Sequence, residues 1–414
     1  MKTENLLTLL GVLGGALVAC GATNQIALLT LDQAIEMAER RHPQLAETRA
    51  LVEAASGRAQ QAGTFPNPEA ILGAQQIPIQ SYPVPDRQYV AGFGQTLPLG
   101  NRLSKARDAE LLEREVRLRG LEGVYRQLRK RVQGSFATAL YQESAFQAQT
   151  RITTGLASAV AITQARLDAG DVIPQDLARS EMELARAEVE LRRSQSLRKQ
   201  GLLSRSAAMG DPNLEVKSVE GSLDVTFEVA TLDSLAANLS SQPELREAEA
   251  GVRASNARID LAKAERIPDV KVEALYHRLE VSGQNTFDLG LSIPLPLFNR
   301  NQGRLREARS EAVAAEARAR NTANELNLNL RESYVALTTA LDNLTTFRTQ
   351  ILPRAETVLK SAELRYSAGD SALTDVLPVR RDWAAVHLSY LETLREVMQS
   401  WAEVSSFLTQ TTKR

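Results

Sequence analysis

Hydrophobic residues recur every three or four positions through much of the second half of the chain. The stripe comprises Leu305, Ala308, Ala312, Ala315, Ala319, Ala323, Leu326, Leu330, Tyr334, Leu337, Leu341 and Leu344. A repeat of about 3.5 residues keeps one seam of a helix facing its neighbour, so the stripe predicts coiled-coil packing with a left-handed supercoil. The alanines in the stripe allow two helix backbones to approach closely.

A second long helix is predicted in the first half, because no proline lies between Pro98 and Pro174. A helix from Arg102 to Leu167 is about 100 Å long at about 1.5 Å per residue, far beyond the usual globular helix. Such a helix needs lateral partners to bury its apolar stripe. Shorter helices are predicted at Leu31–Ala62, Gln175–Lys199, Leu232–Ala264 and Thr374–Leu408.

Between the short and long helices of each half, the apolar period changes to the alternation that is typical of a strand. In the second half one face carries Val270, Val272, Ala274, Tyr276, Phe287, Leu289, Leu291 and Ile293, with a turn at Ser282–Asn285. In the first half a weaker copy carries Ala70, Leu72, Ala74, Tyr89, Ala91, Phe93 and Leu97, with a loop at Pro78–Pro85. Each hairpin therefore has one apolar and one largely polar face.

A soluble two-faced sheet is the simpler interpretation of these hairpins, but the length of the strands and the predicted export signal favour a membrane. Their strands can reach the length of about 9–11 residues that a tilted membrane strand needs. Four strands are too few to close a barrel, whose common forms begin at about eight, so several chains would have to share one.

The two halves repeat the same landmarks about 200 residues apart. Leu31-Asp32 matches Leu232-Asp233, Pro43 matches Pro243, Leu97-Pro98-Leu99 matches Leu295-Pro296-Leu297, and Ala169-Gly170-Asp171 matches Ala368-Gly369-Asp370. A two-fold duplication predicts two structural units that share one architecture. We expect a signal peptide at 1–19, a lipidated segment at 20–30, repeats at 31–200 and 231–409 around a linker or equatorial segment at 201–230, and a tail at 410–414.

Composition excludes several classes of function. The net charge is −1, and the cations are spread along the chain rather than gathered in a basic block, which argues against a nucleic-acid partner. The sequence contains none of the common hydrolase, zinc-protease, phosphate-loop or paired-cysteine motifs. The histidines, His42, His277 and His387, are scattered, so no metal site, no cofactor and no enzyme activity are predicted.

The N-terminal sequence predicts an export signal. A short start containing Lys2 leads into an apolar run from Leu6 to Val18 that is too short to span a bilayer as a helix. Leu17-Val18-Ala19-Cys20 then resembles a bacterial lipobox, which predicts cleavage after Ala19 and acylation of Cys20. The alternative is a conventional signal end followed by a free cysteine.

Paired glycine turns end the long helix of each half. One is Arg166 to Asp171 around Gly170, and the other is Arg365 to Asp370 around Gly369. Glycine supplies the left-handed residue that ends a helix, so each turn predicts a tight helical hairpin. Both turns are expected at the end of the molecule that lies far from the strands, where exposed turns can serve as docking points.

The duplicated order of helix, strand pair, long helix, glycine turn and helix resembles the TolC family of outer membrane channel proteins, from Leu29 to about Thr409. The stretch from Ser292 to Gly303 resembles the CzcC-like branch, which serves heavy-metal efflux. The resemblance implies a mainly α fold with a small β part, in which a homotrimer builds a 12-stranded outer membrane barrel and a long helical tube. It also implies two partners, a periplasmic adaptor and an inner-membrane pump of the RND class.

The roles of the family's tip residues are assigned here only to positions at which this sequence matches the family pattern. The family's tip turns correspond to the turns around Gly170 and Gly369, and the resemblance implies that these turns dock the adaptor. The residues concerned are Arg166, Gly170, Asp171, Arg365, Gly369 and Asp370. Asp176 and Tyr366 match the offsets of a link between hairpins that keeps the tip closed. Asp375 matches the first aspartate of a pore ring, with the alternative that it only caps the next helix. Ser371 and Pro378 stand where the family pattern has charged residues.

The sequence therefore predicts a lipid-anchored outer membrane channel that extends into the periplasm and exports heavy-metal cations. Two alternatives stay open at this stage. The first is a conduit for drugs or for type I polypeptide secretion. The second, from another class, is a non-conducting periplasmic coiled-coil lipoprotein scaffold.

Overall fold

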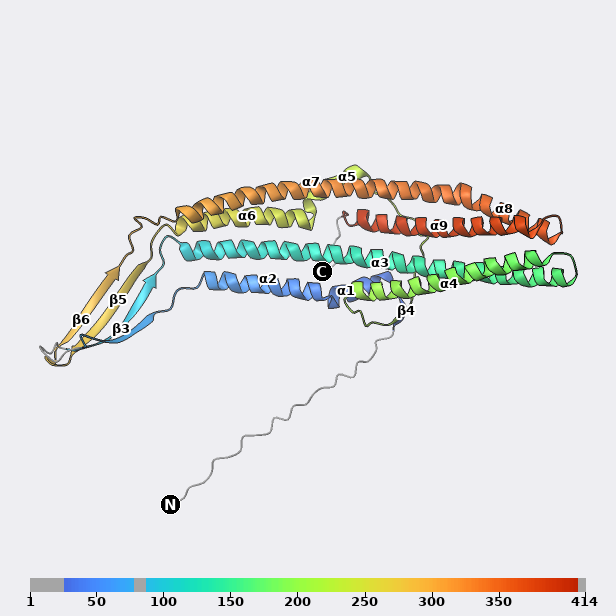
Figure 1. The fold of residues 1–414 in the computed structure, drawn as a ribbon. Helices are drawn as coiled ribbons and strands as arrows, with labels where there is room; N and C mark the ends of the chain where they lie inside the picture. Colours follow the sequence, from blue (N-terminus) through green and yellow to red (C-terminus); the bar gives the residue numbers. More distant parts are fainter. Residues whose placement is uncertain (1–25, 78–86, 409–414) are drawn as a thin grey trace, which may run out of the picture.

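The computed structural model describes residues 26–77 and 87–408. The predicted signal peptide, Cys20, the loop at Pro78–Pro85 and the tail at 410–414 lie outside these residues. The described chain is an elongated rod of helices with a sheet at one end and two helical hairpin turns at the other (Figure 1). Within the described ranges, no helix is both long and apolar enough to cross a membrane.

The long helices form as the sequence predicts, with one interruption. Helix α3 runs unbroken over Arg102–Asp168, a length of 67 residues. Its counterpart consists of α7 (Gln302–Thr346), a π-helical turn at Phe347–Ile351, and α8 (Leu352–Ser367). The π turn ends two residues before Pro353, which lacks the N–H and whose ring clashes with the preceding turn of a regular helix.

Two of the shorter helices were predicted as single elements, and this prediction was wrong. The first divides into α1 (Leu31–Arg41) and α2 (Pro43–Ala62). The second divides into α5 (Leu232–Ala237), a 3₁₀ turn at Leu239–Ser241, and α6 (Pro243–Ala264).

The cause of both breaks is the same. His42 and Gln242 each precede a proline and have extended backbones with ψ of 124° and 137°. The proline ring disfavours helical geometry in the residue before it, whereas proline itself is well suited to the first position of a new helix. The remaining short helices are α4 (Pro174–Ala208), which extends beyond the predicted Lys199, and α9 (Leu373–Ser405).

The predicted hairpins join into one antiparallel sheet. Its strands are β2 (Glu69–Gln75), β3 (Gln88–Leu97), β5 (Val270–Leu279) and β6 (Asn285–Ser292), in the order β2-β3-β5-β6. The pairing of β3 with β5, which places Ala91 opposite Tyr276, connects the two halves of the chain. Ile293, predicted on the apolar face of the second hairpin, lies just beyond the end of β6.

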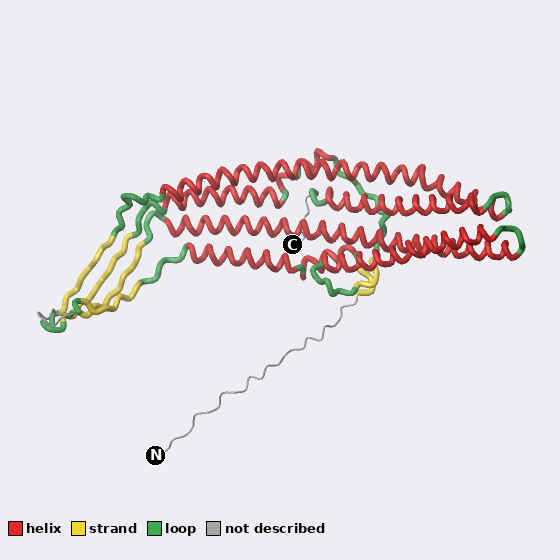
Figure 2. Tube along the Cα trace, viewed as in Figure 1, coloured by secondary structure: helices red, strands yellow, loops and turns green. Residues whose placement is uncertain are grey.

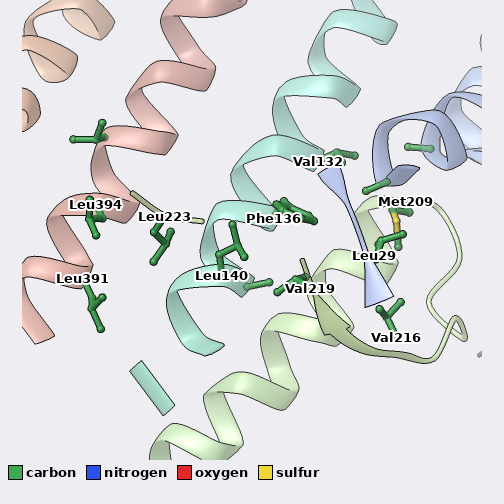
Figure 3. Close-up of a cluster of buried hydrophobic side chains, with 14 of the residues drawn as sticks. Leu29, Val132, Phe136, Leu140, Met209, Val216, Val219, Leu223, Leu391 and Leu394 are labelled. Atoms are coloured by element: carbon green, nitrogen blue, oxygen red, sulfur yellow. The ribbon is translucent and has the colours of Figure 1, made fainter. Parts of the chain in front are cut away.

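A small element that the sequence did not predict lies midway along the rod. Strand β1 (Ile26–Leu29) pairs in parallel with β4 (Val216–Val219). Beneath this pair lies the main hydrophobic core, in which Leu29 and Met209 face Phe136 and Leu140 of α3 (Figure 3). Leu223, in the segment after β4, extends this core to Leu391 and Leu394 of α9.

The helices lie side by side along the rod (Figure 2). In the half near the sheet, α3 packs between α2 and α6, and α6 also packs against α7. In the half near the hairpin turns, α3 packs against α4 and α9, and α9 packs against α7 and α8. In this order α2 and α4 form one edge of the chain, and α7 and α8 form the other.

Candidate docking and gate site at the helical tip

The two glycine turns have the same geometry. Gly170 and Gly369 adopt left-handed backbones with φ of 82° and 83°. In the first turn the N–H of Asp171 donates to the carbonyl of Arg166 at 2.9 Å, and in the second the N–H of Asp370 donates to that of Arg365 at 2.8 Å. This six-residue closure around a left-handed residue is a Schellman motif, which satisfies carbonyls that a helix end leaves free.

Backbone conformation, rather than space, favours glycine in these turns. A Cβ added to either residue would meet no atom within 4 Å. Asp171, Arg365 and Asp370 are exposed, and the hairpin α3–α4 lies beside the hairpin α8–α9 at this end of the rod (Figure 1). The residues predicted for docking therefore come together on one exposed end of the molecule.

Tyr366 holds the two hairpins together from within. Its side chain is buried, and it packs with Leu373, Val376 and Leu377 in a small apolar cluster. The guanidinium carbon of Arg166 lies 5.1 Å from the centre of the Tyr366 ring, within the range of a cation–π contact. The phenol oxygen lies 3.4 Å from Oγ1 of Thr163, which is fully buried in α3.

The predicted link between Asp176 and Tyr366 does not form within one copy of the described chain, because the phenol of Tyr366 contacts Thr163 instead. Asp176 lies in the first turn of α4, where its charge complements the helix dipole. Thr163 was missed in the sequence, since a threonine on a long helix gives no signal of a contact to a residue about 200 positions away.

Asp375 caps helix α9. Its Oδ2 accepts a hydrogen bond of 3.2 Å from the backbone N–H of Ala372. The side chain also remains exposed, so capping leaves its second oxygen available to solvent. Capping and a pore role are therefore compatible in this geometry.

Arginines of α9 add further contacts, one within the hairpin α8–α9 and two to the hairpin α3–α4. Arg380 pairs with Glu363 of α8 at 2.9 Å and donates to the backbone carbonyl of Gly155 in α3 at 3.4 Å. Arg381 approaches Glu183 of α4 at 3.9 Å. Each pair is partly exposed, so each contributes little stability alone. The contacts of Arg380 with Gly155 and of Arg381 with Glu183 connect the two hairpins.

A groove follows the seam between the hairpins. Next to the turns it is a hollow of about 660 Å³, lined on one side by Arg166 and Asp171 and on the other by Gly369 and Leu373. Further along, a second hollow of about 850 Å³ is lined by Leu156, Ala187 and Trp383 with a rim of charged side chains. The groove thus combines an apolar floor with a charged margin.

His387 lies near this groove and stacks on Trp383, with ring centres 5.4 Å apart. Burial, and next the positive charge of Arg151, lower the pKa of His387 below its ordinary value. The imidazole is therefore neutral at pH 7. Among the described residues, no three histidine, cysteine or carboxylate side chains are grouped closely enough to hold a metal ion.

Comparison with known proteins gives a consistent result. Residues 235–409 match the family described as outer membrane efflux protein. The chain is 24% identical to the cobalt-zinc-cadmium resistance protein CzcC of Cupriavidus metallidurans over 384 residues, which cover 92% of this chain and 90% of that protein.

Solved structures agree with this fold. A membrane protein from Pseudomonas aeruginosa superposes with a TM-score of 0.80 at 18% identity, covering 91% of this chain and 92% of that one. The channel protein CusC gives 0.75 at 16% identity, covering 91% of both chains. The resemblance and the fold class predicted from the sequence are confirmed. The match to a family of transport proteins also supports the prediction that the chain is not an enzyme.

Proposed function

We propose, on the premise that this chain is an outer membrane efflux protein with the TolC-type fold, that three copies form the outer membrane channel of a tripartite efflux system. The channel takes its cargo from an inner-membrane RND pump through a periplasmic adaptor, and it performs no chemistry itself. The observation that carries the proposal is the exposed apolar face of the sheet, together with the two open edges of the rod.

The sheet has the polarity of a membrane wall. Leu72, Phe93 and Leu289 lie on one face and are 81%, 68% and 75% exposed. On the opposite face Lys271 pairs with Glu69 and Glu273, each at 2.9 Å. A face of large exposed apolar side chains suits lipid, and a face of ion pairs suits an aqueous lumen. Four strands from each of three chains supply the 12 strands of a closed barrel.

The duplication supports a second copy at each open edge. Ala250 and Ala254 are buried in α6, which packs between α3 and α7, with 0% and 2% of their surfaces exposed. Their counterparts 200 positions earlier, Ala50 and Ala54 of α2, are exposed. Because the two halves share one architecture, we expect the exposed alanines of α2 also to pack against a helix. One copy has no helix at this position, and a second copy would provide one. Val313 and Leu328 give α7 an exposed apolar margin to meet them.

The tip turns and the groove between them support adaptor docking. The turn around Gly170 lies beside the turn around Gly369, whose flanking residues include Arg365 and Asp370 (Figure 1). Arg166, Asp171 and Gly369 line the groove, which offers an apolar floor with charged margins. In the trimer, three copies of Asp375 around the axis would repel one another and attract cations. Asp176 and Tyr366 belong to the proposed gate, in which the buried Tyr366 braces the two hairpins from within. The proposal includes acylation of Cys20 and the division into repeats at 31–200 and 231–409.

The cargo is proposed from the relatives. The printed name of CzcC connects it with resistance to cobalt, zinc and cadmium, and the chain matches nearly its whole length. Heavy-metal cations are therefore the proposed substrates, with selection carried mainly by the pump.

Cell-associated zinc, cobalt and cadmium in a deletion strain and its complemented parent test this proposal. Elemental mass spectrometry should show metal accumulation that complementation reverses. Unchanged levels of all three metals would contradict the proposed cargo. Single-channel conductance of the purified protein tests the conduit separately, since a scaffold would give none.

A further inference from the structure

Four arginines converge where the sheet meets the helices. Arg266 follows α6, Arg300 precedes α7, and Arg306 and Arg309 lie on the first turns of α7. All four line one hollow of about 840 Å³. Within residues 26–77 and 87–408, none of their guanidinium groups has a carboxylate partner. By contrast, Arg304, on the same helix, pairs with Glu265 at 3.3 Å.

The same hollow has an apolar wall. Leu297 and Phe298 line it, and they are 63% and 93% exposed. They belong to the connection between β6 and α7, which continues the exposed apolar face of the sheet through Leu291 and Leu295. Large apolar side chains at such exposure are costly in water, so this connection is suited to a nonpolar medium.

We propose that this hollow, the arginine collar, binds the phosphate of an anionic phospholipid in the leaflet next to the helical rod. The proposal rests on the proposed membrane position of the sheet. If the apolar face of the sheet contacts acyl chains, then residues just beyond its end lie at the depth of the headgroups. Cations without partners at that depth attract phosphate, while Phe298 and Leu297 contact the first part of an acyl chain.

Charge complementarity favours a lipid over a protein partner. Arg306 and Arg309 lie near the open edge of α7, where a second copy would bring α2. The last turns of α2, from Ser56 to Ala62, contain no carboxylate. The end of the helix that a second copy would bring therefore offers these arginines no anionic partner, whereas a phospholipid does.

Titration of the detergent-solubilised full-length protein with phosphatidylglycerol, followed by native mass spectrometry, tests the proposal. Arg266→Gln combined with Arg300→Gln should weaken phosphatidylglycerol binding by about 25-fold, because each arginine near a lipid surface contributes about fivefold. Phosphatidylcholine should bind more weakly than phosphatidylglycerol to the unmodified protein. Arg318→Gln combined with Arg320→Gln is the control, because these arginines are exposed on α7 outside the hollow.

A second double variant distinguishes a lipid from a protein partner. Arg306→Gln with Arg309→Gln should also weaken phosphatidylglycerol binding while the oligomer stays intact. A less stable oligomer with unchanged lipid binding would overturn the proposal and assign these arginines to the subunit seam. Equal loss in the control variant would overturn it as well. Neither measurement depends on metal export, so this proposal can fail while the proposed channel function stands.

Discussion

Individual side chains at the tip act through backbone conformation and burial rather than through reactive chemistry. Gly170 and Gly369 were recognisable in the sequence because a left-handed turn after a long helix favours glycine. Thr163 and Arg380 were not recognisable, since their partners come from other helices and leave no local pattern. The sequence thus identifies the turns but not the contacts that hold them together.

Replacing Gly369 by valine should distort the second tip turn. The left-handed backbone costs a residue with a Cβ about 1–2 kcal/mol, and β-branching adds to this, although no atom blocks the side chain. We expect reduced metal export and reduced cross-linking to the adaptor. Gly369→Asn is the control, because asparagine tolerates this conformation, and it should retain most export. Unchanged export in the valine variant would remove Gly369 from the docking site.

His387 should make the folded chain less stable in acid. Its pKa is lowered in the folded state by burial, so folding favours the neutral imidazole. The stability it contributes is therefore complete above the unfolded pKa of about 6.5 and is lost as the pH falls towards the folded pKa.

Thermal unfolding at pH 7.5 and pH 5.5 measures this effect. His387→Gln should reduce the fall in Tm between the two pH values. It should not abolish the fall, because the pKa of His42 is also lowered, by burial and by Arg131. An equal fall in Tm for the variant and the unmodified protein would contradict the assignment.

At the scale of elements, proline positions decide where helices begin and break. The proline-free interval gave the bounds of α3 to within about one residue, because nothing in it interrupts helix formation. Pro43 and Pro243 were visible as matching landmarks, yet the helices around them were predicted as continuous. The pairing of β1 with β4 was not predicted, since strands of four residues carry too little periodicity.

Leu223 should attach the segment after β4 to the helices. It is 6% exposed and packs in the core shared with α3 and α9. Leu223→Ala should lower the free energy of unfolding by about 2–5 kcal/mol, the usual range for a truncated core leucine. Val225→Ala is the control in the same segment, because Val225 is 39% exposed. Chemical denaturation of both variants checks the difference, and equal losses would contradict it.

At the scale of the whole molecule, the helices of the two duplicated halves leave two open edges in one copy. The inner helices α3 and α6 each have neighbours on two sides, while α2 and α7 each lack one. The sequence revealed the duplication and both hairpins, but it could not show which edges stay open. That depends on the order in which the helices pack.

Ala54→Trp should prevent assembly without unfolding the chain. Ala54 is exposed in one copy, so a large side chain there is tolerated until a neighbour must pack against it. Ala254→Trp is the matched comparison, since the counterpart is 2% exposed and overpacking should cost about 1–3 kcal/mol within the chain. Light scattering and circular dichroism together distinguish the two outcomes. A normal trimer of Ala54→Trp would exclude this edge from the interface.

The π turn at Phe347–Ile351 gives the two hairpins different mechanical properties. Helix α3 is continuous from the sheet to the tip and resists bending along its whole length, whereas α8 is joined to α7 through a turn with altered hydrogen bonding. Arg348 in this turn pairs with Asp224, and Tyr390 of α9 approaches the same carboxylate at 3.4 Å. A force applied at the tip would therefore bend the second hairpin at this π turn. The first hairpin would resist bending, because α3 is continuous.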